Sequence, residues 1–270
     1  MHFNIVAQSS ESTVVTEYKP QAKRSDAYQS EAELEREFIR LLQELGYEYL
    51  PIHKEKDLVD NLRFQLEAVN NYRFSDEEWG RFFSEVLANP KSGIVEKTRL
   101  IQEDFVQVLC RDDGSSKNIT LFDKKNIHNN RLQVINQYTV SKEEGAAHDN
   151  RYDVTVLVNG LPMVHIELKR RGVPIREAFN QIDRYQRDSL WAASGLFEYV
   201  QSFVVSNGTN TKYYSNTTRF NHIKDANSHK AKKEKTSNSF EFTSFWADAG
   251  NRIIPDLVDF TKKMCIRDRC

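Results

Sequence analysis

The chain has few cysteines, and their spacing fits neither a metal site nor a disulfide framework. Its 270 residues include three, Cys110, Cys265 and Cys270, none of them in a Cys-x-x-Cys pair. This pattern disfavours both a structural zinc site and a disulfide-stapled secreted domain. Because a few unpaired thiols suit a reducing compartment, we expect a cytoplasmic protein.

The chain also lacks long apolar runs and glycine-rich loops. No apolar run approaches the ~18 residues of a membrane-spanning helix. The first residues, MHFNIVAQSSESTVV, lack the charged start and apolar centre of a signal peptide. We therefore expect no membrane partner. There is no glycine-rich phosphate loop, so the sequence predicts no ATP site within these residues.

Neither sign of charge dominates. The formal net charge is −1 and the pI is about 6.7, which excludes a globally basic nucleic-acid binder. Any contact with DNA must then be local or supplied by partners. A hydrophobic content of 39% is sufficient for a real core, and the length allows one large or two small domains.

The most informative stretch is residues 151–170, RYDVTVLVNGLPMVHIELKR, which reads as a β-hairpin. Alternate residues of a strand share a face. The even positions are apolar: Val154, Val156, Val158, Val164, Ile166 and Leu168. The odd positions carry the polar groups: Asp153, Thr155, His165, Glu167 and Lys169. The pattern predicts one buried face, with every candidate catalytic group on the other.

The turn of this hairpin must keep that separation of faces. A two-residue loop, Asn159-Gly160, would pair Val158 with Leu161 and set Asp153 opposite Ile166, on the wrong face. That registry is incompatible with a shared polar site, so a longer turn is expected.

A three-residue loop over residues 158–160 shifts the pairing by one position. With Gly160 at positive φ, Asp153 opposes His165 and has Glu167 as its diagonal neighbour, roughly 7–8 Å away at Cα. Two carboxylates at that spacing can grip one divalent ion. We therefore predict the three-residue bulged turn.

The residue types suit metal-dependent phosphodiester hydrolysis. Mg²⁺ prefers oxygen ligands, which Asp153, Glu167 and the carbonyl of Leu168 offer. A bound metal polarises the scissile phosphate and acidifies a water. Lys169, two residues after Glu167, can steady the charge that builds on phosphorus. The alternative is a solvated polar sheet face, because an isolated [DE]-x-K tripeptide is common in a chain with 29% charged residues.

The rest of the chain divides into a helical first part and a strand-rich second part. Helices are predicted over residues 30–45, 57–70 and 75–88, the first and third opened by capping boxes (Ser30 with Glu33, Ser75 with Glu78). Strands are predicted at 13–18, and at 104–111, 118–123 and 132–140, the last three flanking the hairpin. A helix over 175–190, strands at 203–206 and 212–215, and a last helix over 255–262 follow.

Several groups outside the hairpin are candidates for the same site. Gln181 and Tyr185 lie four apart and share a helix face, where they can hold a phosphate or a base edge. The alternative is that Tyr185 is a core aromatic. Glu35 or Glu37 on the first helix is a candidate acid. Possible DNA contacts, if they are not merely solvated, are Arg170, Arg171, Arg176, Arg184, Arg187 and the lysine-rich residues 221–238.

The order Asp153…Glu167-Leu168-Lys169…Gln181-x-x-x-Tyr185 resembles the nuclease domain of the restriction and translocation (R) subunit of type I restriction–modification enzymes, especially the type IC branch. The segments SEAELEREFI, DKKNIHNNRLQVINQ, NRYDVTVLVNGLPMVHIELKRRGVPIREAFNQI and VVSNGTNTKYYSNTT look like that family. The similarity runs over about residues 28–261. The glutamine–tyrosine pair is its most specific part, and the long lysine-rich segment departs from the family pattern.

The resemblance implies a PD-(D/E)xK restriction-endonuclease-like fold: an α/β (α+β) core with a central mixed sheet flanked by helices and an N-terminal helical portion. Asp153 and Glu167 would be metal ligands for Mg²⁺, Lys169 the catalytic lysine, and Gln181 and Tyr185 supports for DNA handling. The substrate would be double-stranded DNA, cut after ATP-driven translocation by helicase motor domains that this chain lacks. Methyltransferase (modification) and specificity subunits would be partners.

The expected organisation is a lead-in over residues 1–27 and an endonuclease domain over 28–261. Within it we expect a helical part at about 30–100 and a catalytic sheet and helix at about 104–220. Residues 264–270 resemble a translated sequencing adaptor, so we expect a non-native tail. Two other functions stay open: a catalytically silent DNA and subunit docking module, and a stand-alone PD-(D/E)xK repair nuclease. The intact triplet argues against the first, and the Gln181 and Tyr185 pair against the second.

Overall fold

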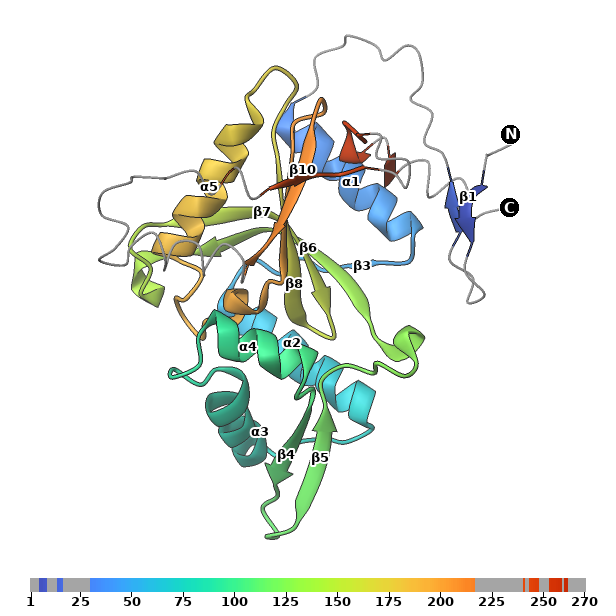
Figure 1. Cartoon of the computed structure of the whole chain (residues 1–270). Helices are drawn as coiled ribbons and strands as arrows, with labels where there is room; N and C mark the ends of the chain where they lie inside the picture. Colours follow the sequence, from blue (N-terminus) through green and yellow to red (C-terminus); the bar gives the residue numbers. More distant parts are fainter. Residues whose placement is uncertain are drawn as a thin grey trace, which may run out of the picture.

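A seven-stranded mixed sheet forms the centre of the molecule (Figure 1). The computed structural model describes residues 5–8, 14–16, 30–216, 240, 243–247, 253–258, 260 and 261. The strands of the sheet are β3 (Glu48–Tyr49), β6 (Leu132–Val140), β7 (Asn150–Val158), β8 (Leu161–Leu168), β9 (Ser202–Ser206), β10 (Thr211–Ser215) and β11 (Ser244–Phe245). Their order is β11-β10-β9-β8-β7-β6-β3, with β3 parallel to β6, β8 parallel to β9, and the other neighbours antiparallel.

One helix covers each face of this sheet (Figure 1). On one side, α1 (Glu31–Glu44) packs Phe38 and Leu42 into a cluster with Val154 and Ile166 of the hairpin. On the other, α5 (Ile175–Asp188) buries its apolar stripe in the larger core. This mixed sheet between helices is consistent with a PD-(D/E)xK-like core and confirms the predicted fold class.

The first helix also confirms its predicted start. The Ser30 side chain accepts a hydrogen bond from the Glu33 amide, and the Glu33 carboxylate accepts one from the Ser30 amide at 2.8 Å. These two bonds satisfy amide groups that a helix start leaves without partners. The helix therefore begins at Glu31, which places Glu31 and Glu35 one turn apart on the side toward the hairpin.

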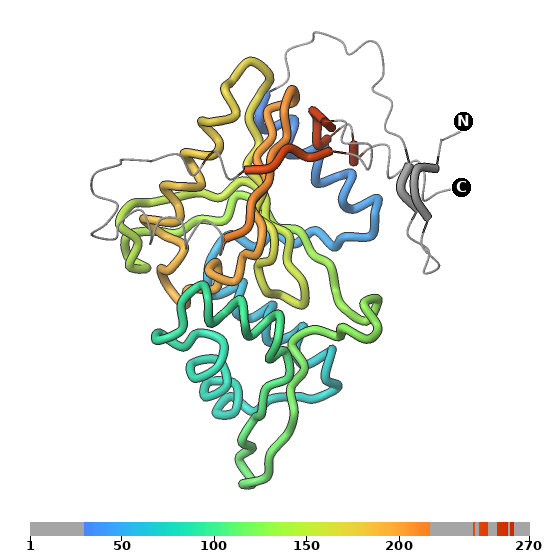
Figure 2. Tube along the Cα trace, in the orientation of Figure 1, coloured from blue at the N-terminus to red at the C-terminus, as the bar shows by residue number. Residues whose placement is uncertain are grey.

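A second lobe extends from one end of the sheet and lies below it in the view of Figure 2. It consists of α2 (Glu55–Asn70), α3 (Asp76–Phe82), a π-helical turn η1 (Phe83–Leu87), α4 (Ile94–Gln102) and a hairpin of β4 (Val106–Cys110) and β5 (Ser116–Thr120). The same core cluster contains Leu62 and Phe82 of this lobe and Phe203 and Val205 of the sheet. The two lobes therefore share one continuous core.

The predicted position of β4 and β5 beside the β7–β8 hairpin is wrong. They pair only with each other, in a separate two-stranded sheet, and β6 alone of the three predicted strands flanks β7. Leu109 and Ile119 bury one face of this hairpin, while Val108 on the other face is 59% exposed. Alternation identifies a strand but says nothing of its partner, which explains the error. The helix α4 was not predicted.

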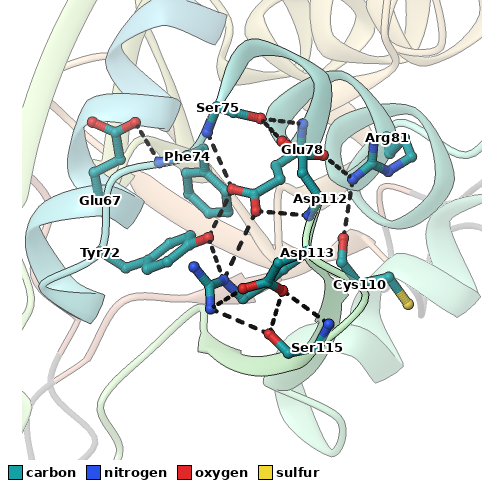
Figure 3. Close-up of polar contacts among 11 residues, drawn as sticks. Glu67, Tyr72, Phe74, Ser75, Glu78, Arg81, Cys110, Asp112, Asp113 and Ser115 are labelled. Atoms are coloured by element: carbon teal, nitrogen blue, oxygen red, sulfur yellow. Dashed lines mark hydrogen bonds and ion pairs between the residues drawn. The ribbon is translucent and has the colours of Figure 1, made fainter.

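A polar network fastens this hairpin to α3 (Figure 3). The buried carboxylate of Glu78 accepts hydrogen bonds from the Tyr72 hydroxyl at 2.7 Å and from the Asp112 amide at 3.2 Å. Asp112 in turn binds Arg81 at 2.7 Å and accepts from the Ser75 hydroxyl. The hydrogen bond from Tyr72 holds the pKa of Glu78 below its usual value, so the network keeps a charged carboxylate at its centre.

The remaining described segments are short. Strands β1 (Ile5–Gln8) and β2 (Val14–Thr16) pair antiparallel, and β2 lies within the predicted strand at 13–18. Single 3-10 turns are η2 (Ile127–Asn129), η3 (Lys142–Glu144) and η4 (Leu196–Tyr199). Residues 257, 258, 260 and 261 are helical, within the predicted last helix. The lysine-rich residues 221–238 and the tail at 264–270 lie outside the described residues. Across the described parts, no helix has the length and apolar character to cross a membrane.

Candidate active site

The β7–β8 hairpin turns in two residues, so the predicted three-residue turn is wrong. Asn159 and Gly160 both have positive φ, 50° and 83°, and Val158 pairs directly with Leu161. Left-handed backbone at two successive positions is typical of a tight hairpin turn with an Asn-Gly sequence. The turn alone would therefore give the registry that the sequence argument rejected.

A β-bulge restores the registry that the site needs. Leu157 pairs with Pro162 and Val156 with Val164, so Met163 is an extra residue on β8. One extra residue shifts all later pairs by one position. Pro162 was the available signal, because proline has no amide hydrogen to donate and concentrates at bulges within sheets.

After the bulge, Val154 pairs with Ile166, and the next residues along the two strands are Asp153 and Glu167. The two carboxyl groups are close enough for each to affect the pKa of the other. The predicted pairing of Asp153 with His165 is therefore wrong, since His165 pairs with Thr155. The bulge places the two carboxylates closer than the diagonal arrangement that was predicted.

The polar face of the hairpin is also buried, contrary to expectation. Helix α5 covers it, and the fractional exposures of Thr155, His165 and Glu167 are 1%, 1% and 0%. A sheet face that only presents charge to water would leave these side chains exposed. Their burial therefore weighs against the solvated polar face as an account of this triplet.

Burial makes the carboxylate pair hold a proton near neutrality. The pKa of Asp153 is raised to about 7, by loss of water first and by the charge of Glu167 second. Burial likewise raises the pKa of Glu167 to about 7, although the nearby Lys169 opposes the shift. Asp153 also accepts a hydrogen bond from the Leu168 amide at 3.3 Å. Ionising both carboxyl groups at this place therefore costs free energy.

Lys169 lies directly beside this pair. Its Nζ is 3.2 Å from Glu167 Oε1 and 3.6 Å from Glu31 Oε2. Burial alone would lower the pKa of the ammonium, but Glu167, Asp153 and Glu31 together raise it. The lysine therefore stays positively charged within contact of the carboxylates.

Helix α1 brings a further acid that sequence reasoning missed. Glu31 contacts Lys169, and its Oε1 accepts from the Arg170 amide at 3.4 Å. Of the two candidate acids on this helix, Glu35 is buried near Asp153, and burial chiefly raises its pKa. Glu37 is instead ion-paired with Arg40 at 2.9 Å. The spacing of four between Glu31 and Glu35 was the signal, because such residues share a helix face.

Glu35 is fixed by the strand beneath it. Its carboxylate accepts from the Gln137 amide group at 2.6 Å and from that of Asn136. Gln137 has a φ of 52°, an uncommon value for a residue with a side chain. Neither β6 residue was a candidate from the sequence, because their role depends on a contact with a helix about 100 residues earlier.

His165 stands behind the carboxylates. Its Nδ1 is 3.2 Å from the Thr155 hydroxyl, and its Nε2 is 3.4 Å from Glu167 Oε2. Burial lowers the pKa of His165 to about 4, so the ring is neutral at pH 7. Neither His165 Nε2 nor Glu167 Oε2 has a hydrogen-bond partner. The orphaned carboxylate oxygen is available to another ligand.

The helix α5 places Gln181 and Tyr185 beside the site, as expected. The Gln181 amide donates to the Tyr185 hydroxyl, and that hydroxyl donates to the backbone carbonyl of Arg151 at 2.6 Å. Tyr185 is 1% exposed and packs against Tyr152 with ring centroids 4.7 Å apart. Tyr185 is thus a core aromatic whose hydroxyl reaches the strand that carries Asp153.

A cleft of about 620 Å³ opens over these groups. Its lining includes Asp153 and Lys169 from the hairpin, Glu31 from α1, and Tyr185 and Arg184 from α5. The cleft therefore gives a ligand access to Asp153 and Lys169, while Glu167 lies beneath.

The candidate arginines are distributed unequally around this cleft. Arg184 lines it and lies over the Tyr185 ring, 5.6 Å from the centroid. Arg176 instead lies over the Phe240 ring at 4.9 Å. The other three are exposed. Arg170 and Arg171 come just after β8, and Arg187 pairs with Asp183.

The donor set fits a hard divalent cation. Asp153 and Glu167 retain protons near neutral pH, and a cation could take the place of those protons. Glu167 Oε2 is buried and has no hydrogen-bond partner. Such cations take one or two carboxylates and keep water or phosphate oxygens as other ligands. Among the described residues there is no group of three or more His, Cys, Asp or Glu that could hold a metal. Asp153 and Glu167 are therefore the two carboxylates here that could hold a cation.

Known proteins share this sequence over most of its length. Residues 28–222 match the family model described as type I restriction enzyme R protein N terminus. The endonuclease subunit of the type I restriction enzyme EcoprrI of Escherichia coli is 47% identical over 257 residues, 95% of this chain and 76% of that protein. An endonuclease subunit from Staphylococcus aureus is 41% identical over 70% of this chain, and one from Staphylococcus saprophyticus is 38% identical over 87%. This chain spans 20% and 23% of those two staphylococcal proteins.

Proposed function

The chain belongs to the family of type I restriction enzyme R proteins, as their N-terminal nuclease domain, and on this premise we propose that it cuts double-stranded DNA at Asp153, Glu167 and Lys169. The family match bears out the resemblance found in the sequence. We assign residues 28–261 to this domain, because the family match and the shared core fall within that range.

One observation carries the assignment of the site. The fully buried carboxylate of Glu167 lies beside the half-buried carboxylate of Asp153, with an ammonium 3.2 Å from Glu167 and a cleft above them. Burying two acids together costs free energy unless a cation or protons compensate. Such a costly cluster in a cleft is more typical of a functional site than of a structural one.

Each residue has a distinct part in the proposed reaction. Asp153 and Glu167 would hold Mg²⁺, which when bound would polarise the phosphate and acidify a water. Lys169 would stabilise the negative charge that develops on the phosphate oxygens. Glu31 and Glu167 keep Lys169 charged and aimed at the cleft. Helix α5 excludes bulk water from the buried side of the site.

Cleavage would be coupled to a motor outside this chain. The staphylococcal relatives are about four to five times longer than the matched segment, which leaves room for further domains. We propose that ATP-driven translocation by helicase domains delivers the DNA, and that modification and specificity subunits choose where the complex binds. ATP would act only through those domains, since the sequence predicts no phosphate loop here.

Plasmid cleavage by the full-length subunit, assembled with its methyltransferase and supplied with ATP and Mg²⁺, tests this function. We expect Asp153→Ala and Lys169→Ala each to lower cleavage at least ~100-fold. ATP hydrolysis should be unchanged, because the motor would lie elsewhere. Omitting Mg²⁺ should stop both cleavage and ATP hydrolysis in the wild type.

Two exposed residues of α2 supply matched controls. Asp60→Ala and Lys56→Ala remove the same side-chain types from an exposed ion pair of 2.7 Å, away from the cleft. Both should cut like wild type. Normal cutting by Asp153→Ala would refute the site. Efficient cutting by the 270-residue chain alone would instead favour a stand-alone nuclease. A wild-type complex that hydrolyses ATP but never cuts would favour a silent docking module.

A further inference from the structure

Among the described residues, two arginines of the cleft have guanidinium groups that form no ion pair and no hydrogen bond. Arg151 and Arg184 both line the cleft and are exposed. Arg151 is near enough to Glu35 for its charge to lower the pKa of that carboxyl group, and Arg184 lies over the Tyr185 ring. Lys169, by contrast, is already engaged with two carboxylates. Arg151 and Arg184 are therefore the cationic groups of the cleft that remain available to a ligand.

The charge of the cleft gives these arginines a specific task. Three carboxylates line it, those of Glu31, Asp149 and Asp153, and a net charge of −1 provides no general attraction for DNA. A phosphate backbone that approaches this site needs local positive charge to offset these acids. An exposed arginine offers several N–H donors in a fork that matches phosphate oxygens.

Two residues of α5 hold the backbone of Arg151 in place. Gln181 donates to the Tyr185 hydroxyl, which donates to the Arg151 carbonyl at 2.6 Å. The single proton of that hydroxyl is therefore committed inside the protein and cannot be given to DNA at the same time. Because Arg151 and Asp153 are two residues apart on β7, the contact also anchors the strand at the edge of the metal-binding pair.

We propose that Arg151 and Arg184 bind DNA phosphates on either side of the scissile one, and that Gln181 and Tyr185 are positioning residues that hold Arg151 in place through its backbone carbonyl. The inference rests on the proposed nuclease function and adds to it. It assigns Arg151, which no sequence motif identified, to the substrate-binding surface. It also moves the glutamine–tyrosine pair from direct DNA contact to support of the strand.

Duplex binding without divalent metal tests the two phosphate contacts. The 270-residue chain is titrated with a fluorescent duplex in EDTA at several salt concentrations, as wild type, Arg151→Gln and Arg184→Gln. Each substitution should lower affinity about tenfold at low salt. Each should also reduce the slope of log K against log salt by about one, equally for duplexes of unrelated sequence.

Arg187→Gln is the matched control. It removes one positive charge from the same helix as Arg184, but Arg187 pairs with Asp183 and does not line the cleft. Its salt slope should equal that of the wild type. An unchanged slope in Arg151→Gln, an equal loss in Arg187→Gln, or a wild-type chain that binds no duplex would each overturn the phosphate assignment.

A double-mutant cycle tests the positioning role of Tyr185. Tyr185→Phe removes the hydroxyl but keeps the ring under Arg184. Its effect on affinity should therefore disappear in an Arg151→Gln background and persist in an Arg184→Gln background. Tyr152→Phe is the control for a lost buried hydroxyl, since Tyr152 is also 1% exposed but binds Ser189 at 2.7 Å instead.

Full additivity of Tyr185→Phe with Arg151→Gln would overturn the positioning role, as would an equal loss of DNA affinity in Tyr152→Phe. These outcomes are separate from failure of the nuclease assignment. Binding is measured in EDTA, where no cleavage is required, whereas the nuclease assignment stands or falls on cleavage by Asp153→Ala and Lys169→Ala.

Discussion

At the scale of single residues, the ionisation of two carboxyl groups of the hairpin is unfavourable in the folded chain. Asp153 and Glu167 are held beside each other under α5, and burial raises both pKa values to about 7 from ordinary values of 3.8 and 4.5. An unfolded chain would ionise both groups at much lower pH. The folded state thus binds protons that the unfolded state releases between about pH 4 and pH 7.

The stability of the metal-free chain should therefore fall as the pH rises through this window. Groups with a raised folded pKa contribute stability at low pH and lose it as the pH passes the folded pKa. We expect the melting temperature in EDTA to be roughly 5 °C lower at pH 8 than at pH 5. His165, with its pKa lowered to about 4, has the opposite effect below pH 6.5.

Comparing the pH dependence of the melting temperature in wild type and Asp153→Asn separates the effect of the carboxylates from that of His165. The variant should lose much of the pH-dependent drop, because one titrating group and the mutual repulsion are gone. Mg²⁺ at pH 8 should raise the melting temperature of the wild type more than that of the variant. Asp60→Asn, at an exposed carboxylate of α2, should behave like wild type. A pH profile shared by all three proteins would contradict the account.

At the scale of elements, the β7–β8 hairpin depends on a turn that packs tightly against helix α2. Gly160 has a φ of 83°, and a Cβ placed there would come 2.6 Å from the Leu62 Cα of α2. That atom belongs to the backbone and cannot rotate away. The tight turn, the bulge after it and the packing of α2 therefore jointly set how far β8 is shifted against β7.

Substituting Gly160→Ala should destabilise the chain strongly. The methyl group adds a backbone clash to the strain of positive φ, and we expect a loss of about 3 kcal/mol in the free energy of unfolding. Urea titration followed by circular dichroism measures this loss. Gly114→Ala is the control, since Gly114 has a φ of 81° and no atom within 4 Å of the added Cβ. Its loss should be about 1 kcal/mol, and equal losses would show that packing against α2 does not matter.

At the scale of the whole molecule, the helical lobe and the sheet lobe are joined by a shared core and by a buried ion pair. Lys97 of α4 is 2% exposed and binds Glu198 at 2.7 Å and the Gly195 carbonyl at 2.8 Å. Both acceptors lie in the segment between α5 and β9. A buried charge of this kind is tolerated only while its partner stays in place.

Removing the lysine should weaken the junction between the lobes. Lys97→Ala leaves Glu198 without its partner, and we expect about 3 kcal/mol lower free energy of unfolding. Unfolding should stay a single transition, because one core serves both lobes. Denaturant melts monitored by tryptophan fluorescence and by circular dichroism test both statements. Arg99→Ala on the same helix is the control, since its pair with Glu103 is exposed and contributes little. Two separated transitions would contradict the shared core.

Much of the fold could be predicted from local patterns. The helix capped by Ser30, the strand over residues 132–140 and the helix that starts at Ile175 are all where periodicity and capping placed them. These signals are local, because each needs only the spacing of apolar residues and one cap. The position of β4 and β5 was not predictable in this way, since strand pairing depends on contacts between distant segments.

The sequence by itself determined the chemical groups of the candidate site and the family. Asp153, Glu167, Lys169, Gln181 and Tyr185 were identifiable from residue type and spacing, because these need no knowledge of packing. Such patterns specify which groups a hairpin and a following helix present, and regular alternation predicts the face on which they lie.

Only the tertiary structure decided how those groups meet. The bulge at Met163 aligned Asp153 with Glu167, α1 supplied Glu31 and Glu35, and the closure of α5 over the hairpin buried Glu167. It also tied Tyr185 to the Arg151 carbonyl. The physical reason is that registry, burial and pKa depend on segments far apart in the chain, and local periodicity carries no information about which of them will pack together.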